Sequence, residues 1–164
     1  MAVAATEKGV VLPVGRRAAS ICFLHGAPVA PENKELFSGF GTSCRITLKG
    51  AKIAEYKVVY EDGDSECVEI GYGWNVPEWN SLDRLFARFA RYPVDSRGIW
   101  EGKLPEPGAN GEAQTAVASI YEWVNPHPHK AIVSLKLKKS FRPVDYSLFA
   151  LTLRECKADC GGIR

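Results

Sequence analysis

The chain has 164 residues, of which 46% are hydrophobic and 24% are charged, so it has the size and composition of one globular domain with a sizeable core. Its 21 lysines and arginines and 19 aspartates and glutamates give a net charge of +2 and are mixed along the chain. We therefore expect neither a nucleic-acid nor a membrane partner, and no apolar run approaches the roughly 18 residues of a membrane span.

The first 17 residues show no hydrophobic period and are predicted to form a flexible tail, followed by one domain over 18–155 and a second tail over 156–164. The domain opens with the apolar run "ASICFLHGA", which is closed by turn residues. In "SCRITLKG", apolar and polar residues alternate. Both patterns indicate strands, since successive side chains of a strand point alternately toward the core and toward water.

The stretch "AEYKVVYEDGDSECVEIGYGW" predicts an antiparallel hairpin. Two strand-like runs, Tyr56 to Glu61 and Ser65 to Ile70, flank the dipeptide Asp62-Gly63. Asp-Gly supplies the positive φ angles that a tight hairpin turn requires.

One segment has a helical period. In "NSLDRLFARFARY", Leu82, Leu85, Phe86 and Phe89 are spaced at i, i+3, i+4 and i+7. This spacing predicts one short helix near 81–91.

The last third of the chain is rich in strand patterns. An apolar run over 115–124 precedes the loop "NPHPH", an alternating stripe follows over 131–137, and "DYSLFALTLRE" is apolar on both faces. We expect Trp100 and Trp123 to fill the core, and Trp123→Ala to lower stability by roughly 3 to 5 kcal/mol. Together the patterns predict an all-β fold, a two-sheet antiparallel sandwich with one short helix.

The five cysteines do not predict a disulfide scaffold or a metal site. They are Cys22, Cys44, Cys67, Cys156 and Cys160. An odd number leaves at least one thiol unpaired within a monomer, and Cys156 and Cys160 lack the second pair or histidine of a zinc site. We interpret them as reduced thiols that behave as small apolar residues, or as one incidental bridge, which leaves the compartment undecided.

Four stretches resemble a known group of modules: "YKVVYEDGDSECVEIGYGWNV", "GIWEG", "IYEWVNPHPHKAIVSLKLKKS" and "FALTLRE". They are similar to β-sandwich jelly-roll modules, related to galactose-binding-type domains, that are attached to bacterial carbohydrate-active enzymes. The resemblance covers roughly residues 18 to 154 and consists mostly of turn and core residues, so it implies the jelly-roll fold more directly than a function. It also allows a structural calcium ion, although spacing identifies no set of about six oxygen ligands. We expect no other cofactor.

The sequence offers no catalytic constellation, and we do not expect an enzyme. The hairpin carries six carboxylates, Glu55, Glu61, Asp62, Asp64, Glu66 and Glu69. We interpret them as its solvated face and turn rather than as the facing pair that glycoside hydrolysis needs. His127 and His129 lack a third ligand at fixed spacing, so they are interpreted as loop residues rather than as a metal site.

The glycine-bounded loop "GYGWNVPEWN" concentrates residue types that bind sugars. Trp74 and Trp79 offer faces that stack on pyranose C–H groups, while Asn75 and Asn80 offer planar polar groups to hydroxyls. Arg97, in "DSRGIW", is the arginine best placed to reach the same ligand from a neighbouring loop. The predicted ligand-binding residues are Trp74, Asn75, Trp79 and Arg97, with the alternative that part of the loop packs as architecture.

Two functions remain from different classes. The first is a non-catalytic carbohydrate-binding or accessory module that keeps a glycan-processing protein near its glycan. The second is a structural or protein-interaction sandwich whose aromatic loop packs against a neighbouring enzyme domain or an oligomer partner, since an exposed apolar patch serves either purpose.

Overall fold

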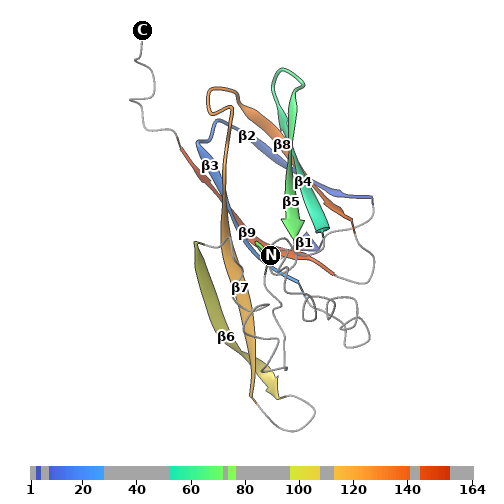
Figure 1. Ribbon diagram of the computed structural model, residues 1–164, viewed down its shortest axis with the longest axis vertical. Coiled ribbons are helices and arrows are strands. Elements are labelled where there is room, and N and C mark those ends of the chain that lie inside the picture. Colours follow the sequence, from blue (N-terminus) through green and yellow to red (C-terminus); the bar gives the residue numbers. More distant parts are fainter. Residues whose placement is uncertain are drawn as a thin grey trace, which may run out of the picture.

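The computed structural model describes residues 3–4, 8–27, 52–71, 74–76, 97–107, 113–140 and 145–155, and these ranges contain strands and no helix. Figure 1 shows the strands arranged as two layers. The strands are β1 (Val3–Ala4), β2 (Val10–Arg16), β3 (Ser20–Gly26), β4 (Lys52–Tyr60), β5 (Ser65–Gly71), β6 (Gly98–Pro107), β7 (Ala113–Val124), β8 (Ile132–Lys139) and β9 (Ser147–Arg154). The predicted all-β class is confirmed.

The two sheets have the strand order of a jelly roll with one extra strand. Sheet A runs β1-β9-β3-β7-β6 and sheet B runs β2-β8-β4-β5, and every described pairing is antiparallel. Without β6, the orders β1-β9-β3-β7 and β2-β8-β4-β5 are those of an eight-stranded jelly roll. In Figure 1, β6 and the lower part of β7 extend beyond the other strands.

The core lies between the sheets and follows from the alternation within each strand. Large side chains without solvent exposure come from both layers, and they include Phe23 on β3, Tyr56 and Val58 on β4, and Leu135 and Leu137 on β8. The rings of Phe23 and Tyr56 stack across the layers with centroids 4.2 Å apart. Aromatic pairing of this kind adds to the free energy gained by burying the apolar area.

The β4–β5 hairpin is confirmed, with a correction to its turn. Glu55 pairs with Glu69 and Lys57 with Cys67 in the antiparallel register. Within the turn, Gly63 has a positive φ, at 89°, and Asp62 does not; the Gly63 N–H donates to the Tyr60 carbonyl at 3.1 Å. The turn therefore has one residue with a positive φ, the glycine, whereas two were expected, at both Asp62 and Gly63.

The N-terminal boundary of the domain was wrong. Residues 10–16, predicted to lie in a tail, form β2 and pair with β8. Leu12 and Val14 point inward and pack against the core, whereas Val11 is exposed. Pro13 obscures this alternation in the sequence, and it is tolerated because β2 is an edge strand of sheet B in the described fold.

The two tryptophans predicted to be buried behave differently. Trp123 packs against the core but is only half-buried. Trp100 is 55% exposed, so the prediction that it fills the core was wrong. The reason is its position. Trp100 lies on the extra strand β6, where it pairs with Ala118 of β7 at the outer face of sheet A.

Several predictions lie outside the described residues. They are the short helix near 81–91, the strand in "SCRITLKG", Trp79, and the tail over 156–164. These stay predictions.

Candidate functional site

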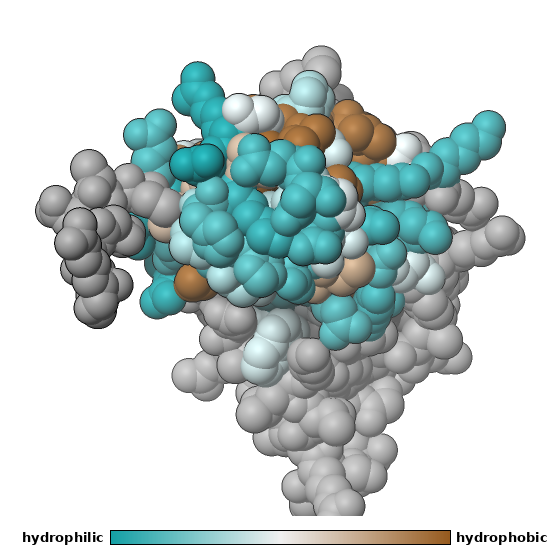
Figure 2. Space-filling view, turned by 90° about the horizontal axis from the view of Figure 1, so that it is seen from above, coloured by the Kyte–Doolittle hydropathy of each residue, from teal (hydrophilic) through white to brown (hydrophobic). Residues whose placement is uncertain are grey.

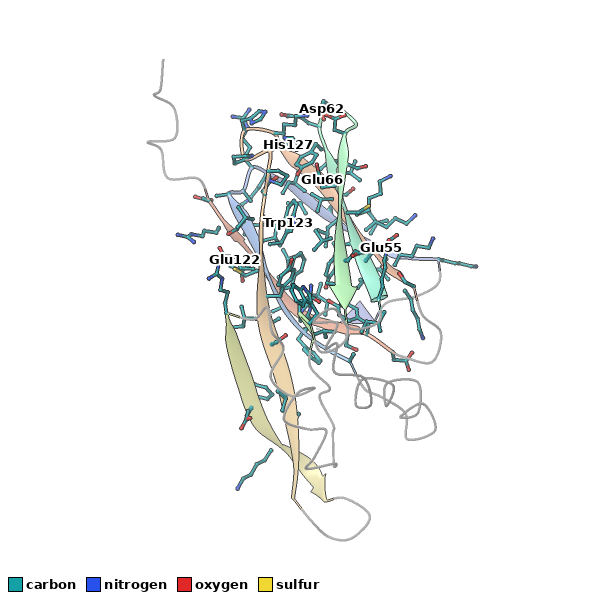
Figure 3. The ribbon with its side chains drawn as sticks, viewed as in Figure 1. Glu55, Asp62, Glu66, Glu122, Trp123 and His127 are labelled. Carbon is teal, nitrogen blue, oxygen red and sulfur yellow. The ribbon has the colours of Figure 1, made fainter. Side chains whose placement is uncertain are left out.

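An open cavity of about 240 Å³ lies between the edge strand β5 and the inner face of β7. It is lined by Lys52, Cys67, Val68, Glu69, Gly71, Trp74, Asn75, Tyr121 and Trp123. Figure 3 shows Trp123 pointing from β7 into the space between the two sheets, on the opposite side of the strand from Glu122. The cavity therefore opens at the side of the sandwich, where β5 ends sheet B.

Three aromatic side chains form its walls. Tyr121 and Trp123 are two positions apart on β7, so the period of the strand places both on the inner face. Trp74 is the third residue after the end of β5, and its N–H donates to the Gly71 carbonyl at 3.1 Å. All three are half-buried, which leaves part of each ring accessible from the cavity.

Asn75 fixes the loop that carries Trp74. It is 1% exposed, and its side-chain amide takes the place of a strand partner along the edge of β5. The Gly71 N–H donates to Asn75 Oδ1 at 2.9 Å, and Asn75 Nδ2 donates to the Glu69 carbonyl at 2.9 Å. Its predicted contact with a ligand stays a prediction, whereas the bonds that the structure shows position Trp74.

Charged groups stand at the rim of the cavity. Lys52 Nζ lies 2.7 Å from a Glu55 carboxylate oxygen and 3.8 Å from one of Glu69. The hydrogen bond to Glu55 is the main cause that raises the pKa of Lys52. One lysine facing two carboxylates leaves the rim with a net charge of −1, which disfavours an anionic ligand.

A buried hydrogen-bond chain supports the cavity from behind. His25 has no solvent exposure; its Nε2 lies 2.5 Å from the Asn75 carbonyl and its Nδ1 2.6 Å from the Tyr146 hydroxyl. Because a carbonyl only accepts, Nε2–H donates to Asn75, Nδ1 accepts from Tyr146, and Tyr146 accepts from Tyr56. Ser119 Oγ also donates to the Asn75 carbonyl, at 3.0 Å.

Burial decides how this chain ionises. Removal from water lowers the pKa of His25 to about 4, although the bond to Asn75 opposes the change. The pKa values of Tyr56 and Tyr146 are raised, chiefly by burial. His25, Tyr146 and Tyr56 are therefore neutral at physiological pH, and their hydrogen bonds hold the Asn75 backbone beneath the loop of Trp74.

Arg97 is not part of this site. Its Nε lies 3.4 Å from a Glu122 carboxylate oxygen, and Glu122 is on the outer face of β7, whereas Tyr121 and Trp123 are on the inner face. The structure thus brings Trp74 and Asn75 together and separates Arg97 from them. Trp79 lies outside the described residues.

Figure 2 looks onto the end of the molecule that carries the β4–β5 turn, where hydrophilic side chains make up most of the described surface and a few hydrophobic ones are exposed among them. Lys130 Nζ lies 2.5 Å from carboxylate oxygens of both Asp62 and Asp64. His127 Nε2 lies 3.3 Å from a Glu66 oxygen. Within the described ranges, no group of three or more His, Cys, Asp or Glu side chains could hold a metal ion.

Of the nine residues that line the cavity, only Trp74 and Asn75 were predicted to bind a ligand. Trp123 was expected in the core, and the six others were not predicted: Lys52, Cys67, Val68, Glu69, Gly71 and Tyr121. Tyr121 could have been found, since it shares the face of Trp123 by its spacing. The other five belong to the β4–β5 hairpin. Its solvated face was recognised, but only the pairing of the sheets shows that its edge stands opposite β7.

No protein-family model, no curated protein and no solved structure matches the chain. In the part of the chain that the structure describes, no helix has the length and apolar character needed to cross a membrane.

Proposed function

We propose that the protein is a non-catalytic carbohydrate-binding or accessory module that binds a neutral sugar in the cavity between β5 and β7. The observation that carries the proposal is the convergence of Trp74, Tyr121 and Trp123 on one open cavity with polar groups at its rim. Sugars combine apolar C–H faces with hydroxyls, so a site for them needs aromatic faces and a few placed polar groups.

The size of the cavity favours a small unit. About 240 Å³ is less than the roughly 300 to 1,000 Å³ of sites that enclose drug-sized molecules. The side of the sandwich is open, so one sugar ring can enter while the remainder of a glycan stays in solvent. Limited burial predicts an affinity between millimolar and micromolar, about 4 to 8 kcal/mol.

The charge of the rim favours a neutral sugar. Lys52 is already paired with Glu55 and faces Glu69. Lys52 can donate hydrogen bonds to sugar hydroxyls and the two carboxylates can accept them, whereas the net negative charge of the three groups would repel a carboxylate on the ligand. The module would act beside a glycan-processing enzyme, as do the accessory modules of bacterial carbohydrate-active enzymes that its sequence resembles. A calcium ion, which that resemblance allows, would be revealed by a lower melting temperature in EDTA.

Calorimetry against a panel of neutral plant, bacterial and host oligosaccharides tests the proposal. Trp74→Ala should abolish binding, whereas Trp100→Ala removes the same side chain from the outer face and should leave neutral-sugar binding unchanged. Trp100→Ala should keep its melting temperature within a few degrees of wild type, since changes at exposed positions usually stay within about 0.5 kcal/mol. Trp74 is half-buried, so the melting curve of Trp74→Ala is measured to show that the variant is folded at the temperature of the binding assay.

The interaction-module alternative has its own observation. Val11, Val124 and Val133 are large apolar side chains with 58%, 65% and 49% exposure. Silence across the sugar panel, combined with a stable complex through the Trp74 loop with an adjacent enzyme domain or a second copy, would replace the carbohydrate proposal by this one.

A further inference from the structure

The outer face of sheet A carries an exposed tryptophan that lies over a glycine. Trp100 covers Gly102: a Cβ placed on Gly102 would lie 2.1, 2.5 and 2.9 Å from three atoms of the indole ring. Trp100 pairs with the small residue Ala118 on β7, whereas Gly98, two positions before Trp100, pairs with Ile120, which is 37% exposed. The ring therefore rests on the backbone of β6, and Trp100 keeps 55% of its surface exposed.

The same face carries two arginines gathered around one carboxylate. Glu122 accepts from Ser20 Oγ at 2.6 Å and from Arg154 Nη1 at 3.3 Å, and Arg97 Nε lies 3.4 Å from its other oxygen. The hydrogen bond from Ser20 is the main cause that lowers the pKa of Glu122. Glu122 thus stays ionised and holds both guanidinium groups in place.

This cluster has donors and charge left for a ligand. Two arginines against one carboxylate give a net charge of +1, and the Arg97 and Arg154 side chains are 66% and 69% exposed. Each guanidinium has five N–H donors in a planar fork that matches a carboxylate or sulfate. The cluster of Arg97, Arg154 and Glu122 therefore has the opposite charge to the rim of the cavity, which carries net −1.

The ring and the cluster lie on one strip. Ala118, the partner of Trp100, and Glu122 are four positions apart on the same face of β7, with the partly exposed Ile120 between them. Four residues of a strand span about 13 Å, a length that a short oligosaccharide can bridge.

We infer that the outer face of β6 and β7 is a second binding site, for an anionic glycan, with a sugar ring stacked on Trp100 and a carboxylate or sulfate paired with Arg97 and Arg154. It goes beyond the proposed function and uses different residues, so either site can fail alone. A nucleic-acid strand would also stack and pair, but a net charge of +1 is small beside the basic grooves that track a phosphate backbone.

Calorimetry with oligogalacturonate, sulfated dextran oligosaccharide, neutral dextran oligosaccharide and single-stranded oligonucleotide tests the inference. We expect binding of one or both anionic sugars, weakened by salt, and the two probes distinguish carboxylate from sulfate. Trp100→Ala should weaken it about tenfold or more, the loss of one stacking contact. Arg97→Ala and Arg154→Ala should each weaken it about fivefold.

Two glycine variants provide a matched pair. Gly102→Ala should displace the indole ring and reduce anionic-sugar binding as Trp100→Ala does. Gly98→Ala is the control, because a Cβ there meets only Ile120 Cδ1 at an ordinary 3.6 Å. Trp74→Ala should have no effect on this site.

Four results would overturn the inference: equal binding of neutral dextran, no binding of either anionic sugar, tighter binding of the oligonucleotide, or a loss of binding in Gly98→Ala equal to that in Gly102→Ala. A change from monomer to oligomer that depends on Trp100, measured by ultracentrifugation without sugar, would assign the face to self-association instead.

Discussion

Trp123 and Trp100 lie on neighbouring strands of one sheet, yet one packs against the core and the other is exposed. Trp123 points toward sheet B, where β5 stands opposite β7. Trp100 lies on the outer face of β6, the strand added to sheet A beyond the jelly-roll order. Whether an aromatic side chain is buried or available to a ligand therefore depends more on the layer that lies across from it than on the residue type.

The largest expected effect lies inside the sandwich and depends on pH. Burial lowers the pKa of His25 from 6.5 to about 4, so the folded protein binds fewer protons than the unfolded chain between these values. The stability associated with neutral His25 is complete above pH 6.5 and is lost as pH falls toward 4, by about 3 kcal/mol at roughly 1.4 kcal/mol per pH unit.

Urea denaturation at pH 7 and pH 4 measures this loss in wild type and in His25→Gln. Glu122 and Asp62 also have lowered pKa values, so their contributions appear in both proteins and cancel in the comparison. An equal loss in the two proteins would show that His25 is not the group responsible. The NMR signals of His25 should also show no titration between pH 5 and 7.

The next effect is the removal of Trp123. Trp123→Ala should lower the free energy of unfolding by about 2 to 3 kcal/mol, less than a fully buried tryptophan would cost, because one side of the ring already faces the cavity. Denaturant midpoints at constant slope measure it. A midpoint equal to that of wild type would show that Trp123 contributes no more to the core than the exposed Trp100.

Asn75→Ala separates the anchor of the loop from its aromatic residue. It leaves the Gly71 N–H and the Glu69 carbonyl without the bonds that Asn75 supplies, so stability should fall by about 1 to 2 kcal/mol. Neutral-sugar affinity should fall as well, since Trp74 loses its fixed position. Retained affinity in a destabilised variant would mean that Trp74 needs no such support.

The smallest effect is expected on the outer face. Trp100→Ala should change the free energy of unfolding by no more than about 0.5 kcal/mol, as exposed substitutions usually do. Urea denaturation of Trp100→Ala and Trp123→Ala under the same conditions compares the two losses of unfolding free energy. A loss above about 2 kcal/mol would place Trp100 in a packed environment and contradict its role as a platform.

Local patterns predicted the hairpin because a period of two around Asp62-Gly63 is determined by neighbours in sequence. They failed where the answer depends on distant strands. Pro13 hid β2, whose partner β8 is more than a hundred residues away, and Arg97 was placed beside Trp74 because no local signal tells which face of β7 it reaches. The aromatic loop was recognised from composition, but the wall formed by Tyr121 and Trp123 required the pairing of two sheets.

The central claim is that the two faces of β7 carry two sites with opposite preferences, and the indole N–H signals of the four tryptophans test it most directly. Each would be assigned by its Trp→Phe variant and followed by NMR during titration with a neutral and then an anionic oligosaccharide. The account predicts that the neutral sugar shifts the signals of Trp74 and Trp123, and that the anionic sugar shifts that of Trp100. Unchanged signals at millimolar sugar, or shifts of Trp74 and Trp100 by the same ligand in parallel, would contradict it.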